Sequence, residues 1–271
     1  MIVRIEQWLV VALYVVAFLA YAVAFRKEGK DSFTKARWLL RGAVITHLLH
    51  LVHLSIFLRR LPVTDVFEAM TLCVWFFAAT YVSLEWRVPE KALGVFILPV
   101  IIFLQSLSAL FLDYERILPP ILEDTIFEIH VFIMLLAYAA FAISFIASLL
   151  YLLLSRELQG KQLGLFYRRL PSLELFDTLS NRAVNIGLYI LTAGLLLASY
   201  TGFRLGDQFS FLDPKVLAVV ITWLIYVLHI LFRKASGWRG RRAAFLSLIG
   251  FSWSMFSFLI VSQLFSKVHQ F

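Results

Sequence analysis

Eight long apolar runs constrain the fold of this 271-residue chain more than any other feature of its sequence. A membrane-spanning helix needs about 20 mostly apolar residues, and a backbone in lipid must satisfy its own hydrogen bonds. The runs are Trp8–Phe25, Trp38–Leu58, Val66–Trp86, Ala92–Leu112, Ile126–Leu154, Ala183–Tyr200, Val216–Phe232 and Ala243–Phe265. Hydrophobic residues make up 61% of the chain, more than a soluble domain of this length can bury. The sequence predicts an all-α integral membrane protein of about eight transmembrane helices, one bundle and one domain over residues 1–271.

Lys and Arg residues alternate between rich and poor connections along the chain. One set of connections holds 18 of the 25 basic residues and the other set holds 7. Because cytoplasmic connections carry the excess, both termini are predicted to face the periplasm of a bacterial inner (cytoplasmic) membrane. This bias accounts for the net charge of +8, so no nucleic-acid partner is expected. The first run is followed at once by Arg26 and Lys27 and is expected to be a retained span.

Three polar or basic segments between the runs also carry predictions. In the longest connection, Ser155–Arg182, apolar residues recur every three positions from Leu173 to Leu179, which predicts a short amphipathic helix in the membrane interface. Asp65 and Glu68 open the third run, where acids cap a helix favourably. Membrane orientation explains the positive charge of the segment Gly237–Arg242, but it does not explain the particular residues of that segment.

Two histidines are expected at the same outer level of the membrane. His130 lies near the outer start of the fifth run and His269 lies just beyond the outer end of the eighth. Two neutral imidazoles at one level are suitable axial ligands for a heme iron. Asp213 and Lys215 lie in an outer loop on the same side, and Lys215 could pair with a ligand carboxylate. Two unrelated interfacial histidines, hydrogen-bonded to water or backbone, fit the spacing as well.

The other four histidines lie deeper. His229 precedes Arg233 by four residues, so it is ~6 Å inside the cytoplasmic boundary. His47, His50 and His53 follow one another in steps of three, roughly along one helix face. His47 matches His229 best in depth and His50 is the middle of the stripe, which permits a second bis-imidazole site. A polar interhelical contact, a proton path and structural hydrogen bonds are the alternatives.

Covalent chemistry is not indicated by the sequence. Cys73 is the single cysteine and lies inside an apolar run. No Cys-x-x-Cys-His motif is present, so any heme would be held without a thioether bond. No nucleophile–base pair is visible, and an enzyme is not expected.

A series of short segments in the C-terminal half has a recognisable order and spacing. The segments are Glu128-Ile-His130-Val, Ala137-Tyr138-Ala139, Leu170-Pro171-Ser172, Leu191-Thr192-Ala193-Gly194, Asp213-Pro214-Lys215, Ile221–Tyr226, Gly237–Ala244, Gly250-Phe251 and His269. In these segments the chain resembles the CcsA family of cytochrome c assembly proteins, within a heme-handling superfamily that includes CcmC and CcmF. Residues ~126–271 form the CcsA-like core, and Pro62–Glu68 is more weakly similar.

This resemblance implies a helical membrane bundle that translocates or presents heme in cytochrome c assembly. It implies non-covalent heme b at an outer site formed by His130 and His269. It also implies heme within the membrane, held by His229 and a helix-two histidine that the resemblance does not identify; His50 and His47 are the leading candidates and His53 is the third. The implied partners are heme, the lipid bilayer, and other cytochrome c assembly proteins or a heme-synthesis enzyme.

The chain departs from the family pattern in the outer loop. Family members carry a tryptophan-rich segment there, whereas Gly206–Val216 contains no tryptophan and has Phe209 and Phe211 nearby. This departure shifts weight toward the HemX proteins associated with tetrapyrrole synthesis genes. A HemX-like regulator of tetrapyrrole synthesis is therefore one alternative function. A transporter of another substrate, with a histidine proton relay, is the other.

Overall fold

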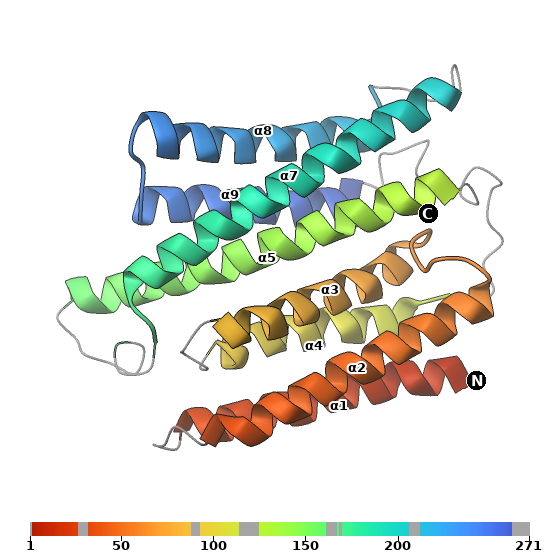
Figure 1. The fold of residues 1–271 in the computed structure, drawn as a ribbon, viewed down its shortest axis with the longest axis horizontal. Helices are drawn as coiled ribbons and strands as arrows, with labels where there is room; N and C mark the ends of the chain where they lie inside the picture. The colour runs from red at the N-terminus through yellow and green to blue at the C-terminus, as the bar shows by residue number, and fades with distance from the viewer. Residues whose placement is uncertain are drawn as a thin grey trace. The chain divides into compact units, whose positions relative to one another are not determined.

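The computed structural model describes residues 2–26, 32–87, 93–113, 125–160, 167, 170–205 and 212–261. Their elements are α1 (Ile2–Arg26), α2 (Ser32–Leu58), α3 (Val66–Arg87), α4 (Gly94–Phe111), α5 (Thr125–Gln159), α7 (Leu173–Leu205), α8 (Pro214–Ala235), α9 (Arg241–Phe256) and the π-helical η3 (Ser257–Val261), shown in Figure 1. Eight helices in this part of the chain are long and apolar enough to cross a membrane. The predicted all-helical membrane class is therefore confirmed.

The chain divides into two compact units. The first comprises Met1–Ile117 with Tyr167–Leu170, and the second comprises Leu118–Phe166 with Pro171–Phe271. In the first unit α1 packs against α2 and α4, and α3 packs against α4 and α2. In the second unit α5 packs against α7 and α9, and α8 packs against α9 and α7. A single functional domain and periplasmic termini stay predictions.

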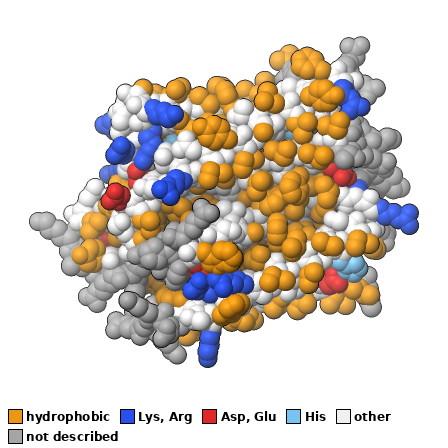
Figure 2. Space-filling model, in the orientation of Figure 1, with side chains coloured by type: hydrophobic (Ala, Val, Ile, Leu, Met, Phe, Trp, Pro, Cys, Tyr) orange, Lys and Arg blue, Asp and Glu red, His pale blue; other side chains and the backbone are white. Residues whose placement is uncertain are grey.

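The surface of each unit has the polarity expected in lipid. Large apolar side chains are exposed along the helices, such as Leu49 at 64% and Leu196 at 69%. Polar side chains are buried, with Gln7, His47 and Gln105 all at 0% exposure. Figure 2 shows hydrophobic side chains spread along the helices. Lipid replaces water as the solvent for these faces, which explains why apolar groups point outward.

The start of α7 differs from the prediction of a separate amphipathic helix. Leu173 begins α7, and the helix runs without interruption to Leu205 over 33 residues. Phe176 has 0% exposure, so it is packed inside the second unit and does not lie at a lipid surface. The three-residue apolar spacing reflects packing against neighbouring helices, and the prediction of a separate interfacial helix is wrong.

Glycines allow α5 and α7 to approach closely. An added Cβ at Gly187 would lie 2.5 Å from Cε1 of Phe141, and one at Gly194 would lie 2.7 Å from Sδ of Met134. Phe141 in turn stacks on Tyr226 of α8, with ring centroids 3.7 Å apart and planes 9° apart. Small residues at a helix–helix contact bring backbones together where no hydrophobic effect drives association. This contact fixes the helix that carries His130 against the helix that carries Gly194.

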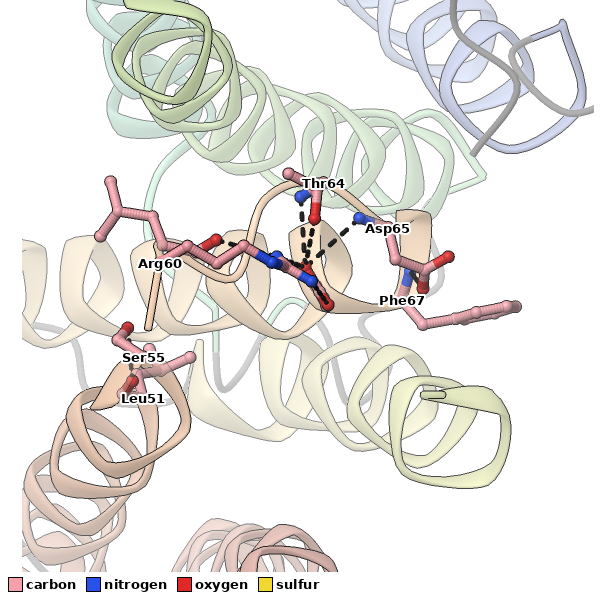
Figure 3. A network of polar contacts seen from close by, with 8 residues as sticks. Leu51, Ser55, Arg60, Thr64, Asp65 and Phe67 are labelled. Carbon is pink, nitrogen blue, oxygen red and sulfur yellow. Dashed lines mark hydrogen bonds and ion pairs between the residues drawn. The ribbon is translucent and has the colours of Figure 1, made fainter. Parts of the chain in front are cut away.

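A buried carboxylate organises the connection between α2 and α3 (Figure 3). Glu68 accepts hydrogen bonds from Nη1 and Nη2 of Arg60 at 2.6 and 2.7 Å. It also accepts from the backbone N and Oγ1 of Thr64, at 3.2 and 3.0 Å, and from the backbone N of Asp65 at 3.3 Å. Asp65 accepts from the backbone N of Phe67 at 2.9 Å. The two acids cap α3 as predicted, and Glu68 additionally ties the preceding loop to the helix.

Candidate functional site

His130 on α5 is held by a backbone carbonyl of α7. Its Nδ1 lies 3.1 Å from the carbonyl oxygen of Gly194. A carbonyl oxygen can only accept, so Nδ1 carries the proton and the lone pair is on Nε2. Metal-ligating histidines use this arrangement, because a hydrogen bond from one ring nitrogen orients the other toward the metal. The structure therefore presents His130 in the tautomer that a heme iron requires.

Lys215 and Asp213 lie at the start of α8 in the same unit. The side chain of Lys215 lies within electrostatic range of His130. Asp213 is the N-cap of α8, and its Oδ1 accepts from the backbone N of Lys215 at 2.8 Å. Asp213 thus has a structural role that sequence reasoning did not assign. His269, the predicted second ligand, lies outside the described residues, so the outer pair stays a prediction.

His229 on α8 is joined to a cluster of buried hydroxyl groups. Its Nε2 lies 3.2 Å from Oγ of Ser247 on α9. The hydroxyl oxygen of Ser180 lies 3.3 Å from that of Ser247, and 2.9 Å from those of Ser144 and Ser148 on α5. The histidine is 1% exposed, and its Nδ1 makes no hydrogen bond of good geometry among the described residues, although the backbone of Ala243 lies close enough to interact with the ring. A buried polar atom with no partner costs free energy, so this nitrogen is a candidate ligand position.

Asp177 connects three elements near this end of the second unit. It accepts from Nη1 and Nη2 of Arg233 at 2.9 and 2.5 Å, and from the backbone N of Gly240 at 2.9 Å. These contacts join the start of α7 to the end of α8 and to the turn before α9. Sequence reasoning missed Asp177, because its partners are 56 and 63 residues away and no local pattern marks it.

His47 on α2 has both ring nitrogens engaged inside the first unit. Nδ1 lies 3.0 Å from the hydroxyl of Tyr14, and Nε2 lies 3.0 Å from Oγ1 of Thr71. Thr71 donates its proton to Oε1 of Gln105 at 3.1 Å. The Thr71 hydroxyl must then accept a hydrogen bond from Nε2–H of His47, while the Tyr14 hydroxyl donates one to Nδ1 of His47. His47 therefore has no lone pair available for a metal in this structure.

His50 also has both ring nitrogens in polar contacts, and His53, one turn further along α2, is partly exposed. His50 Nδ1 lies 3.3 Å from Oε2 of Glu6, and its Nε2 contacts Oε1 of Gln7. His53 Nδ1 lies 2.9 and 2.8 Å from the two carboxylate oxygens of Glu6, and its side chain is 43% exposed. The histidine stripe thus makes polar interhelical contacts, one of the predicted alternatives. His229 belongs to the second unit, and its pairing with His50 or His47 stays a prediction.

Together these features define a class: a multi-pass helical membrane protein with buried histidines in each of two units. Among the described residues, no group of three or more His, Cys, Asp or Glu side chains is placed to hold a metal ion. A two-ligand heme site is compatible with this, because each axial position needs one imidazole.

The chain belongs to the cytochrome c assembly protein family, whose model it matches over residues 63–269. It is 27% identical over 235 residues to the cytochrome c biogenesis protein CcsA of Mesostigma viride, covering 78% of this chain and 77% of the relative. The CcsA of Guillardia theta is 25% identical over 229 residues, covering 78% and 76%. The CcsA of Synechococcus sp. (strain JA-2-3B'a(2-13)) is 24% identical over 270 residues, covering 78% and 77%. The resemblance seen in the sequence is confirmed.

Proposed function

We propose that this protein binds heme at the outer end of its second unit and translocates or presents it in cytochrome c assembly. The observation that carries the proposal is the hydrogen bond from His130 Nδ1 to the Gly194 carbonyl, which puts the proton on Nδ1 and the lone pair on Nε2, the atom that would bind iron. Family membership supports the assembly role, since the CcsA relatives are cytochrome c biogenesis proteins. Heme is here the cargo of the protein.

The residues of the outer site have distinct roles in this proposal. His130 supplies one axial imidazole and His269 supplies the other, a combination typical of low-spin b-type heme. Lys215 holds a heme propionate by a charge-assisted hydrogen bond, and Asp213 fixes the backbone of Lys215. The heme is non-covalent, because Cys73 is the single cysteine in the chain.

A second, inner heme position at His229 is part of the same proposal. Its support is the burial of His229, whose Nδ1 makes no hydrogen bond of good geometry within the described part of the chain. In the first unit His50 is engaged by Glu6 and Gln7, and His47 by Tyr14 and Thr71, so either histidine would have to release a hydrogen bond before it could bind iron. Heme would then move from a position near the cytoplasmic boundary of a bacterial inner membrane to the outer site.

The test is a cavity variant of the outer ligand in the full-length protein. His130→Gly should lower the heme content of the detergent-purified protein, and free imidazole should restore both the content and the low-spin spectrum. His53→Gly is the matched control, since His53 is also half-buried and its Nδ1 is taken by Glu6. If His130→Gly keeps the heme content and spectrum of the wild type, His130 is not a ligand.

A HemX-like regulator is the second candidate function. The observation that favours it is the outer segment Gly206–Val216, which contains no tryptophan, unlike the segment of the family pattern. The two functions differ in their partner. An apocytochrome c that co-purifies with the protein supports assembly, whereas co-purification of a heme-synthesis enzyme alone supports regulation.

A further inference from the structure

The turn between α8 and α9 carries an unusually dense group of exposed cations. We call it the basic turn and define it by four exposed side chains: Lys234, Arg239, Arg241 and Arg242. Arg233, also in this segment, is held in an ion pair with Asp177 at 2.5 Å, so its charge is compensated. The turn joins two helices that are long and apolar enough to span a membrane (Figure 1). It therefore lies at the level of the lipid headgroups.

The backbone of the basic turn is fixed by several independent contacts. The Asp177 carboxylate accepts a hydrogen bond from the backbone N–H of Gly240 at 2.9 Å, and it also binds the guanidinium of Arg233. Gly237 and Gly240 have φ values of 64° and 60°, a region that glycine adopts without steric cost. Trp238 stacks on Phe232, with ring centroids 4.7 Å apart. Membrane orientation depends on the number of basic residues and not on their geometry, so it does not account for this construction.

The chemistry of the turn matches a phosphate group. Guanidinium groups bind phosphate in a bidentate manner, and basic residues next to a membrane span attract anionic lipids. Arg242 packs over the ring of Trp238, its Cζ 5.6 Å from the ring centroid, which limits the conformations of its side chain. The first amides of α9, which follow Gly240, have no side-chain cap and add to the positive potential.

We propose that the basic turn is a binding site for the phosphate of an anionic lipid headgroup. The Asp177 contacts hold the turn in the conformation that binds. This site is separate from the proposed heme sites, and it is independent of whether the protein binds heme.

Native mass spectrometry of the delipidated full-length protein tests the proposal. The protein is titrated with phosphatidylglycerol and, in parallel, with phosphatidylcholine. Arg241→Gln/Arg242→Gln should weaken phosphatidylglycerol binding by about twenty-five-fold, at about fivefold for each cation removed. The control, Arg26→Gln/Lys35→Gln, removes two other exposed cations, which belong to the predicted cytoplasmic set. It should change binding by less than about twofold. Equal losses in the two double variants would mean that bulk charge alone attracts the lipid, and the proposal would be wrong.

Asp177→Asn distinguishes a site of fixed geometry from simple charge attraction, because the two explanations predict opposite changes in the affinity for phosphatidylglycerol. Removing a carboxylate beside the turn adds net positive charge, so charge attraction alone predicts tighter phosphatidylglycerol binding. A fixed site predicts weaker binding, because the side-chain amide of Asn in place of Asp177 cannot form the ion pair with Arg233 and makes a weaker hydrogen bond with the backbone N–H of Gly240. If folded Asp177→Asn protein binds phosphatidylglycerol as tightly as the wild type or more tightly, the Asp177 contacts do not hold the turn in the conformation that binds. If this variant does not fold, the comparison of the two double variants decides the proposal alone.

Discussion

The Arg60–Glu68 pair gives the sharpest test of the described packing in the first unit. The side chains of Arg60 and Glu68 are 13% and 1% exposed, and two guanidinium hydrogen bonds go to this one carboxylate. A third goes from Nη1 to the backbone carbonyl of Leu61 at 3.3 Å. Arg60→Met leaves a buried carboxylate without its counter-charge, which should lower the free energy of unfolding by about 3–5 kcal/mol. Adding Glu68→Gln removes the stranded charge but keeps an acceptor for the amides of Thr64 and Asp65. The double variant should therefore recover about 2 kcal/mol relative to Arg60→Met.

Unfolding of the purified protein in detergent, followed by circular dichroism during a denaturant titration, measures these differences. Arg59→Met is the control, because Arg59 is an exposed neighbour, and its substitution should change stability by less than about 0.5 kcal/mol. A loss below about 1 kcal/mol for Arg60→Met, or a double variant less stable than Arg60→Met alone, would refute the buried-pair reasoning.

Three further predictions concern packing, topology and the inner site. Gly187→Ala should lower the free energy of unfolding by about 1–3 kcal/mol, because Phe141 is stacked on Tyr226 and cannot move away from the added methyl group. The control, Gly42→Ala, should be neutral or stabilising, because nothing lies within 4 Å of the added methyl group. Equal effects of the two variants would mean that the α5–α7 contact is looser than described. A phosphatase fused after Phe271 should be active and one inserted after Ser236 inactive, if the termini are periplasmic; the reverse pattern would invert the predicted orientation. His229→Met should raise the reduction potential of an inner heme, and an unchanged heme content, spectrum and potential would exclude His229 as a ligand.

The membrane architecture could be predicted from the sequence because its cause is local. A span is a property of about 20 consecutive residues, so each of the eight runs could be assigned to a helix without knowledge of its neighbours. The start of α7 could not be predicted in the same way. Leu173–Leu179 has a spacing that fits lipid contact or protein contact equally well, and the packing of Phe176 decides between them.

The sequence indicates candidate ligand residues but not the hydrogen bonds that their side chains make. The positions of His130 and His47 are evident in the sequence, but their hydrogen-bond partners Gly194 and Thr71 come from other helices. Those partners determine which ring nitrogen is free. They leave Nε2 of His130 available and engage both nitrogens of His47, a distinction that spacing along one helix cannot show.

Binding of heme without a covalent bond is the property on which the proposed function depends. The absorption spectrum of the full-length protein, purified in detergent and supplied with hemin, tests it. We expect a low-spin b-type spectrum and complete extraction of the heme by acidified organic solvent, because the chain has one cysteine and no Cys-x-x-Cys-His motif. Folded protein that takes up no hemin, or that shows only a high-spin spectrum of loosely associated heme, would contradict it.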